Sequence, residues 1–153
     1  MAKTVRDIMD PNPPTVGSDA SVEDVVRLMG EHDRAVVLVV NEGGRCVGIV
    51  TEADLVIGDE EGDIHIPHYL ELFGGIVFLE PLRNFERKFK KAVASRVNDL
   101  MTEDPVTIDV AATAREAAKG IVDRHHNHLP GVEHGRLVGL VTRADVLGAL
   151  VED

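Results

Sequence analysis

The sequence predicts an α+β fold, in which two β-α-β-β-α units pack pseudo-symmetrically against each other through their sheets. The first observation behind this prediction is an internal repeat: Met9 corresponds to Met101, and the segment Gly48–Asp54 corresponds to Gly139–Asp145. The second observation is that each copy alternates strand-like and helix-like patterns. Because a unit of about 50 residues cannot bury its own sheet, the two copies are expected to cover each other's apolar surfaces.

The repeat divides the chain of 153 residues into three parts. We expect residues 1–57 to form the first unit and residues 97–153 to form the second. Residues 58–96 then form a connecting segment between them.

The first helix of each unit is marked by a capping box. Ser21 is followed three residues later by Asp24, and Thr113 is followed by Glu116. Apolar residues then recur at helical spacing, which predicts one face packed against a core. These residues are Val22, Val25, Val26 and Met29 in the first copy, and Ala114, Ala117, Ala118 and Ile121 in the second.

A β-hairpin is expected after each helix. Val36–Val40 is apolar without interruption, which is typical of a strand buried on both faces. A turn at residues 41–44 returns the chain into the strand Cys46–Val50, and a turn near Gly135 leads into Leu137–Val141. A closing helix is expected to begin within each repeated Thr-x-x-Asp motif.

Composition restricts the function and the partners. The chain has 16 basic and 27 acidic residues, a net charge of −11, which disfavours binding to nucleic acid. No uninterrupted apolar run approaches the roughly 20 residues of a membrane span. The single cysteine, Cys46, excludes an internal disulfide and fits a reducing compartment, so a cytoplasmic protein is expected.

Both repeats resemble the cystathionine β-synthase (CBS) domain, a family whose members occur as tandem pairs. The resemblance covers both units and not the connecting segment. It is carried by three elements that recur in the same order: Asp7–Met9 and Asp99–Met101, then Pro13–Val16 and Pro105–Ile108, then Gly48–Asp54 and Gly139–Asp145.

The repeated Thr-x-x-Asp motif has two interpretations. A helix N-terminus favours a phosphate, the hydroxyls of Thr51 and Thr142 can donate to it, and Asp54 and Asp145 can accept both hydrogens of a ribose diol. The same pattern is also a capping box that only starts a helix. The duplicated surroundings favour at least one nucleoside site.

The resemblance implies where the rest of such a ligand would lie. The strands around Val16 and Ile108 would sandwich a purine, which backbone groups next to Thr15 and Thr107 would recognise. Similar CBS pairs bind AMP, ADP, ATP or S-adenosylmethionine in this way.

The same resemblance implies basic residues near the phosphate. His128 stands in the family's basic position, in the motif His128-Leu129-Pro130, and Arg34 resembles that position in the first repeat. In the second repeat Thr142 is followed by Arg143, which could reach a phosphate, whereas in the first repeat Thr51 is followed by Glu52, which would repel one. We therefore expect unequal sites, with the Asp145 pocket the better phosphate binder.

Two other kinds of site are disfavoured. His125, His126, His128 and His134 lack the ligand spacing and the cysteine partners of a zinc site. The sequence also offers no nucleophile–base–orienter arrangement, so no enzyme activity is expected.

The connecting segment has three interpretations. Leu82, Phe85, Phe89 and Val93 form an apolar stripe within the strongly basic stretch 83–96. A helix packed on its own acidic units is favoured. An oligomer or partner interface that includes Tyr69, Leu72, Phe73, Ile76 and Phe78 is the second interpretation, and a helix lying on an anionic membrane is the least favoured.

The sequence therefore predicts a regulatory module. We expect it to bind an adenosine nucleotide between the units, to need no cofactor, and to act through a homodimer or a separate effector protein. The alternative is a structural or interaction protein whose pockets are vestigial and whose connecting segment makes the contacts.

Overall fold

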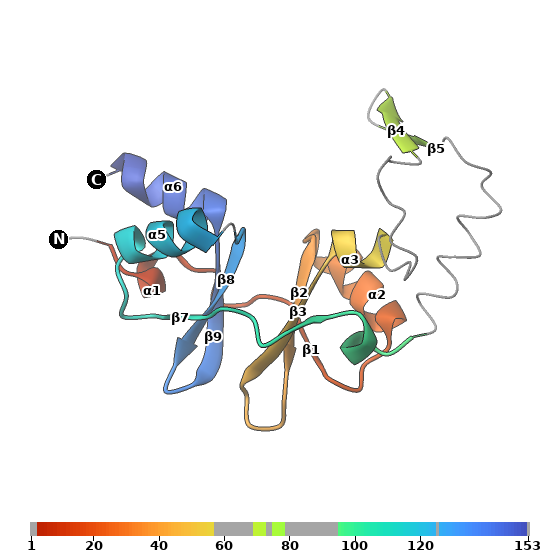
Figure 1. The fold of residues 1–153 in the computed structure, drawn as a ribbon, viewed down its shortest axis with the longest axis horizontal. Helices are drawn as coiled ribbons and strands as arrows, with labels where there is room; N and C mark the ends of the chain where they lie inside the picture. Colours follow the sequence, from red (N-terminus) through yellow and green to blue (C-terminus); the bar gives the residue numbers. More distant parts are fainter. Residues whose placement is uncertain (1–2, 57–68, 73–74, 79–94, 125, 153) are drawn as a thin grey trace.

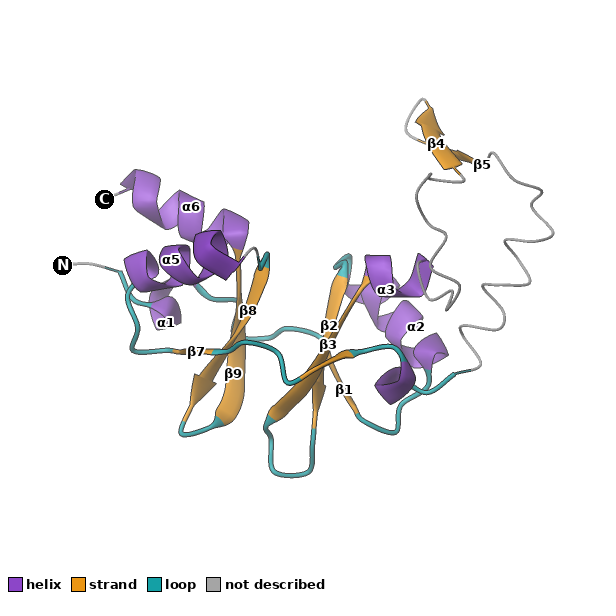
Figure 2. Ribbon diagram, in the orientation of Figure 1, coloured by secondary structure: helices purple, strands orange, loops and turns teal. Residues whose placement is uncertain are grey.

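The computed structural model describes residues 3–56, 69–72, 75–78, 95–124 and 126–152. The predicted α+β architecture is confirmed: each unit has a sheet with helices on its outer side, and the two sheets face each other (Figures 1 and 2). The elements from the first repeat are α1 (Val5–Ile8), β1 (Thr15–Gly17), α2 (Val22–His32), β2 (Val36–Val40), β3 (Cys46–Thr51) and α3 (Glu52–Val56). Those from the second are the 3-10 helix η1 (Val97–Asp99), β6 (Thr102–Glu103), β7 (Ile108–Asp109), α5 (Ala114–Arg124), β8 (His128–Glu133), β9 (Arg136–Thr142) and α6 (Arg143–Glu152).

Three strands of each sheet share one topology, and the first sheet has β6 as a fourth strand. In the first, β1 runs parallel to β2, β2 is antiparallel to β3, and β3 is antiparallel to β6. In the second, β7 runs parallel to β8, and β8 is antiparallel to β9. The duplication seen in the sequence therefore corresponds to the order β1-β2-β3 in one sheet and β7-β8-β9 in the other.

The helix starts follow the predicted capping boxes. Asp24 N donates to Ser21 Oγ at 3.2 Å, so Ser21 caps α2. The second box is reciprocal, because Glu116 N donates to Thr113 Oγ1 at 3.1 Å and Thr113 N donates to Glu116 Oε2 at 3.4 Å. Such caps satisfy backbone groups that the first turn of a helix leaves without partners.

Strand β2 is apolar throughout because both of its faces are buried. Val37 and Val39 pack toward α2 in the core of the first unit. Val36 and Leu38 point the other way and form a small core between the units with Leu140 of β9. Side chains alternate across a strand, so one uninterrupted apolar run serves both cores.

The opening segment of each repeat packs in the other repeat's unit. Val5 of α1 is fully buried among residues of the second unit, with Ala117 and Val141 among its neighbours in that core. Val97 of η1 is fully buried in the core of the first unit. Strand β6 likewise completes the first sheet, while Asp10 forms an antiparallel bridge with Leu140 at the matching edge of the second. The two units are therefore interlocked.

This exchange explains the glycine that opens each repeated motif. A Cβ atom added to Gly48 would lie 2.3 Å from Met101 Sδ, and one added to Gly139 would lie 2.4 Å from Met9 Sδ. Each glycine leaves room for the methionine of the exchanged segment. The matched Met and Gly positions in the sequence are thus two sides of one packing contact.

Part of the connecting segment lies outside the described residues. This applies to its residues 58–68, 73–74 and 79–94, which include the predicted apolar stripe and most of the basic stretch. Between them, β4 (Tyr69–Leu72) and β5 (Gly75–Phe78) form an antiparallel hairpin. The three interpretations of the segment stay predictions.

Candidate functional site

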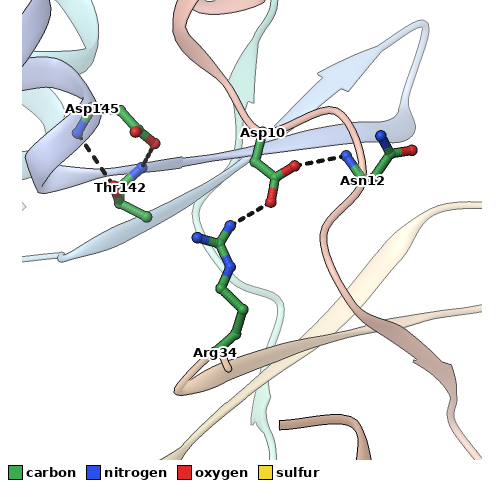
Figure 3. A network of polar contacts seen from close by, with 5 residues as sticks. All are labelled: Asp10, Asn12, Arg34, Thr142 and Asp145. Carbon is green, nitrogen blue, oxygen red and sulfur yellow. Dashed lines mark hydrogen bonds and ion pairs between the residues drawn. The ribbon is translucent and has the colours of Figure 1, made fainter. Parts of the chain in front are cut away.

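Each repeated Thr-x-x-Asp motif caps the helix that follows it. In the first repeat, Thr51 N donates to Asp54 Oδ2 at 2.8 Å, and the Thr51 hydroxyl lies 3.4 Å from the same oxygen. In the second, Thr142 N donates to Asp145 Oδ2 at 2.9 Å, and Asp145 N donates to Thr142 Oγ1 at 3.3 Å (Figure 3). All four side chains are half-buried. Capping is thus one role of the motif in both copies.

Capping leaves part of each carboxylate available. The hydrogen bonds from the described residues engage Oδ2 of Asp54 and Oδ2 of Asp145, and none of them engages Oδ1. A carboxylate oxygen has two lone pairs, so Oδ1 can still accept hydrogen bonds from ligand hydroxyls. Capping and ligand binding are therefore compatible.

A cleft of about 440 Å³, which we call the Thr51 cleft, lies between the two units. Its volume falls within the roughly 300–1,000 Å³ that is usual for small-molecule sites. The first repeat supplies Ala35, Ile49, Thr51, Glu52 and Ala53, and the second supplies Thr102, Pro105, Val106, His126, Asn127 and His128. The walls combine apolar side chains with a few polar groups, as ligand sites do.

A second cleft of about 450 Å³ contains Thr15, so we call it the Thr15 cleft. It lies between the segment 11–15, helix α2 and strand β9. Its other lining residues include Leu28, His32, Leu137 and Val138. It holds neither threonine of the repeated motif.

The structure separates the predicted site residues into groups. Thr51 and His128 line the Thr51 cleft, and Thr15 lines the other. Asp54 and Arg143 do not line the Thr51 cleft, but each is bonded to a residue that does: Asp54 Oδ2 accepts from Thr51 N, and Arg143 Nε donates to Asn127 Oδ1 at 3.0 Å. Thr107, Pro130, Thr142 and Asp145 line neither of these two clefts, and the expectation that the Asp145 pocket is the better phosphate binder stays a prediction.

The two predicted purine-binding side chains pack inside their own units. Val16 packs against the core of the first unit and Ile108 against that of the second. Ile49 and Val106 provide the apolar walls of the Thr51 cleft instead. Ile49 follows Gly48 in the repeated motif and Val106 lies between Pro105 and Thr107, so both stand within sequence elements that had been identified.

Arg34 and His128, which come from different repeats, lie close to the same boundary. Arg34 Nη2 forms an ion pair with Asp10 Oδ2 (Figure 3). Burial lowers the pKa of His128, and the positive charge of Arg34 lowers it further. His128 is therefore held in its neutral form near pH 7. Asp10 was not expected here from the sequence, because it belongs to an exchanged segment.

The remaining candidates give no metal or thiol site among the residues that the structure describes. No group of three or more His, Cys, Asp or Glu side chains is placed to hold a metal ion there. Burial raises the pKa of the Cys46 thiol, which disfavours the reactive thiolate. Across the same part of the chain, no helix has the length and hydrophobicity of a bilayer span.

Comparisons with known proteins agree with the repeat. The family model described as the CBS domain matches residues 5–59 and 97–152. An uncharacterised protein of Methanocaldococcus jannaschii is 31% identical over 153 residues, which cover 96% of this chain and 90% of that relative. The chloroplastic CBS domain-containing protein CBSX2 of Arabidopsis thaliana is 26% identical over 158 residues, which cover 97% of this chain and 64% of that relative.

Solved structures show the same fold. The crystal structure of CBSX2 from Arabidopsis thaliana superposes with a TM-score of 0.76 at 23% identity, covering 99% of this chain and 96% of that one. A crystal structure of CBSX2 in complex with AMP gives a TM-score of 0.70 at 24% identity, covering 98% of this chain and 97% of that one.

Proposed function

The chain belongs to the CBS domain family, and on this premise we propose that it is a regulatory module that binds an adenosine nucleotide in the Thr51 cleft. The observation that carries the proposal is the composition of this cleft. Both repeats line it, its volume suits a nucleotide, and it contains the threonine of a repeated Thr-x-x-Asp motif. The complex of CBSX2 with AMP shows that a protein of this fold holds such a ligand.

The walls of the cleft suggest how each part of the nucleotide is held. Ile49 and Val106 offer apolar surfaces to the two faces of the adenine ring. The Thr51 hydroxyl can donate to a ligand oxygen, and Asp54 Oδ1 can accept from the ribose hydroxyls. Glu52 lies in the same wall and disfavours a highly charged ligand, so AMP is expected to bind more tightly than ATP.

Regulation follows from the contribution of both repeats. A ligand that contacts Thr51 on one side and His128 on the other stabilises the arrangement of the units in which both contacts form. It can shift the equilibrium only by its difference in affinity for the two arrangements. We propose that this shift is transmitted to an effector protein in trans, that the module works as a homodimer in the cytoplasm, and that it has no enzyme activity.

Isothermal titration calorimetry on nucleotide-stripped protein tests the proposal. AMP, ADP, ATP and S-adenosylmethionine are titrated separately, and saturable heat with at least one of them is expected. Absence of heat with all four would contradict the proposal.

Two matched variants then locate the site. Asp54→Asn keeps an oxygen that can cap α3 but removes the negative charge that holds the ribose diol. We expect about a tenfold loss of affinity, which corresponds to losing one charged hydrogen bond. Asp145→Asn makes the same change at the other motif and serves as the control. Equal losses from both variants would contradict the assignment to the Thr51 cleft.

One observation favours the alternative function as a structural or interaction protein. Asp54 and Asp145 both cap helices, so stabilising the start of a helix is by itself a sufficient role for the repeated motif. In that case the four ligands give no heat, while both Asp→Asn variants lower thermal stability by similar small amounts. The titration therefore separates the two functions.

A further inference from the structure

Asp10 and Arg34 form an ion pair that joins the two units. Arg34 lies between α2 and β2 of the first unit, where its backbone N–H donates to Met29 O at 3.0 Å. Asp10 is held by the second unit, because its N–H and C=O both bond to Leu140 of β9 at 2.9 Å. The two side chains are 33% and 31% exposed, so the pair lies partly shielded at the boundary.

The carboxylate is the fixed member of this pair. Asp10 Oδ1 accepts from Asn12 N at 2.9 Å, and Oδ2 accepts from Arg34, so both oxygens are engaged (Figure 3). Its backbone is fixed as well, through Leu140. The Arg34 side chain is long and has many rotamers, so Arg34 is the member that can change partner.

The charge of Arg34 acts on the Thr51 cleft. Ala35, the next residue, lines that cleft, and so does His128, whose pKa responds to Arg34. Among the residues that the structure describes, the lining contains the carboxylate of Glu52 and no lysine or arginine. An anionic group bound at this wall needs a cation that stays charged at neutral pH, and Arg34 provides one.

We propose that Asp10 is a built-in competitor for Arg34, which lowers the affinity of the Thr51 cleft for ligands that carry a phosphate and leaves its affinity for uncharged nucleosides unchanged. When the cleft is empty, Asp10 holds the guanidinium. A phosphate recruits Arg34 away from Asp10, whereas a neutral nucleoside leaves the ion pair intact. The inference rests on the proposed function and adds to it the residue pair that limits how much more tightly the cleft binds a nucleotide than its nucleoside.

The test compares AMP with adenosine in calorimetric titrations of the full chain. Asp10→Asn removes the competing charge but keeps the oxygen that accepts from Asn12 N. We expect AMP to bind about two- to fivefold more tightly to this variant, the range that partly exposed ion pairs contribute. The affinity for adenosine should stay unchanged.

Asp109→Asn is the matched control. Asp109 Oδ1 accepts from Ala111 N at 2.8 Å, so it makes the same turn contact as Asp10 with the residue two positions later. No ion pair joins it to a described residue. The variant changes the net charge by the same amount, and AMP affinity should match that of the unmodified protein.

Arg34→Gln completes the cycle. It should weaken AMP binding by about tenfold while leaving adenosine binding unchanged, and adding Asp10→Asn to it should have no further effect. The competitor role would be overturned if Asp10→Asn and Asp109→Asn raised the affinity for AMP equally, or if Asp10→Asn raised the affinity for adenosine as much as that for AMP. The proposed function would stand in either case. If neither AMP nor adenosine binds the unmodified protein, both proposals fail.

Discussion

Gly48→Ala is expected to destabilise the protein because of a single neighbour. The new Cβ would lie 2.3 Å from Met101 Sδ, 2.9 Å from Met101 Cγ and 3.2 Å from Met101 Cβ. The first two atoms can move away by rotation of the flexible methionine side chain. The third is attached to the backbone, so its contact is relieved only if the exchanged segment shifts.

The expected cost follows from these contacts. Overpacking of a core site costs about 1–3 kcal/mol, and the lower chain entropy of alanine in the unfolded state returns about 0.4–1 kcal/mol. We expect a net loss of about 1–2 kcal/mol in the free energy of unfolding. For a chain of 153 residues, this lowers Tm by about 3–6 °C.

Urea unfolding of four proteins measures this contact: the unmodified chain, Gly48→Ala, Met101→Ala and the double variant. Removing the side chain of Met101 beyond Cβ eliminates the two shortest contacts, so Gly48→Ala should cost little in that background. Gly30→Ala is the control, because its added Cβ in α2 has no atom within 4 Å from the described residues beyond its own stretch of helix, and it should stabilise by about 0.5–1 kcal/mol. The same cost of Gly48→Ala in both backgrounds would refute the packing explanation.

Three further outcomes are expected. Gly139→Ala should destabilise with only partial rescue by Met9→Ala, because the added Cβ also lies 2.9 Å from the backbone oxygen of Asp10; full rescue in thermal melts would contradict this. Ser21→Ala should lower the free energy of unfolding by about 1 kcal/mol through loss of the cap on α2, and an unchanged urea midpoint would argue against the cap. Burial and Arg34 lower the folded-state pKa of His128 below its unfolded value of 6.5. The contribution of neutral His128 to the free energy of unfolding is therefore complete above pH 6.5 and is lost as the pH falls from 6.5 toward the folded-state pKa. The stability difference between the unmodified protein and His128→Asn should therefore shrink between about pH 7 and 5, and a constant difference would contradict it.

The repeat and the local patterns were enough to predict the fold. Capping boxes mark where α2 and α5 begin, and the apolar run Val36–Val40 predicts a strand buried on both faces, with the second face now known to contact Leu140. These features depend on residues near each other in the chain. Periodicity and cap chemistry therefore carry the information.

The exchange of opening segments could not be predicted in this way. Nothing local in Val5 indicates that it packs in the second unit, since an apolar residue suits either core equally well. The composition of the Thr51 cleft depends on this exchange. It is also why Asp10, rather than a residue near Arg34 in sequence, forms the ion pair with Arg34.

The central claim is that an adenosine nucleotide binds in the Thr51 cleft, and a methyl NMR titration with AMP tests it most directly. The methyl signals of Ile49 and Val106, which line the cleft, should shift together and saturate. Those of Val122 and Val151, exposed on α5 and α6, should stay in place. Unchanged signals from Ile49 and Val106 at saturating AMP would contradict the account.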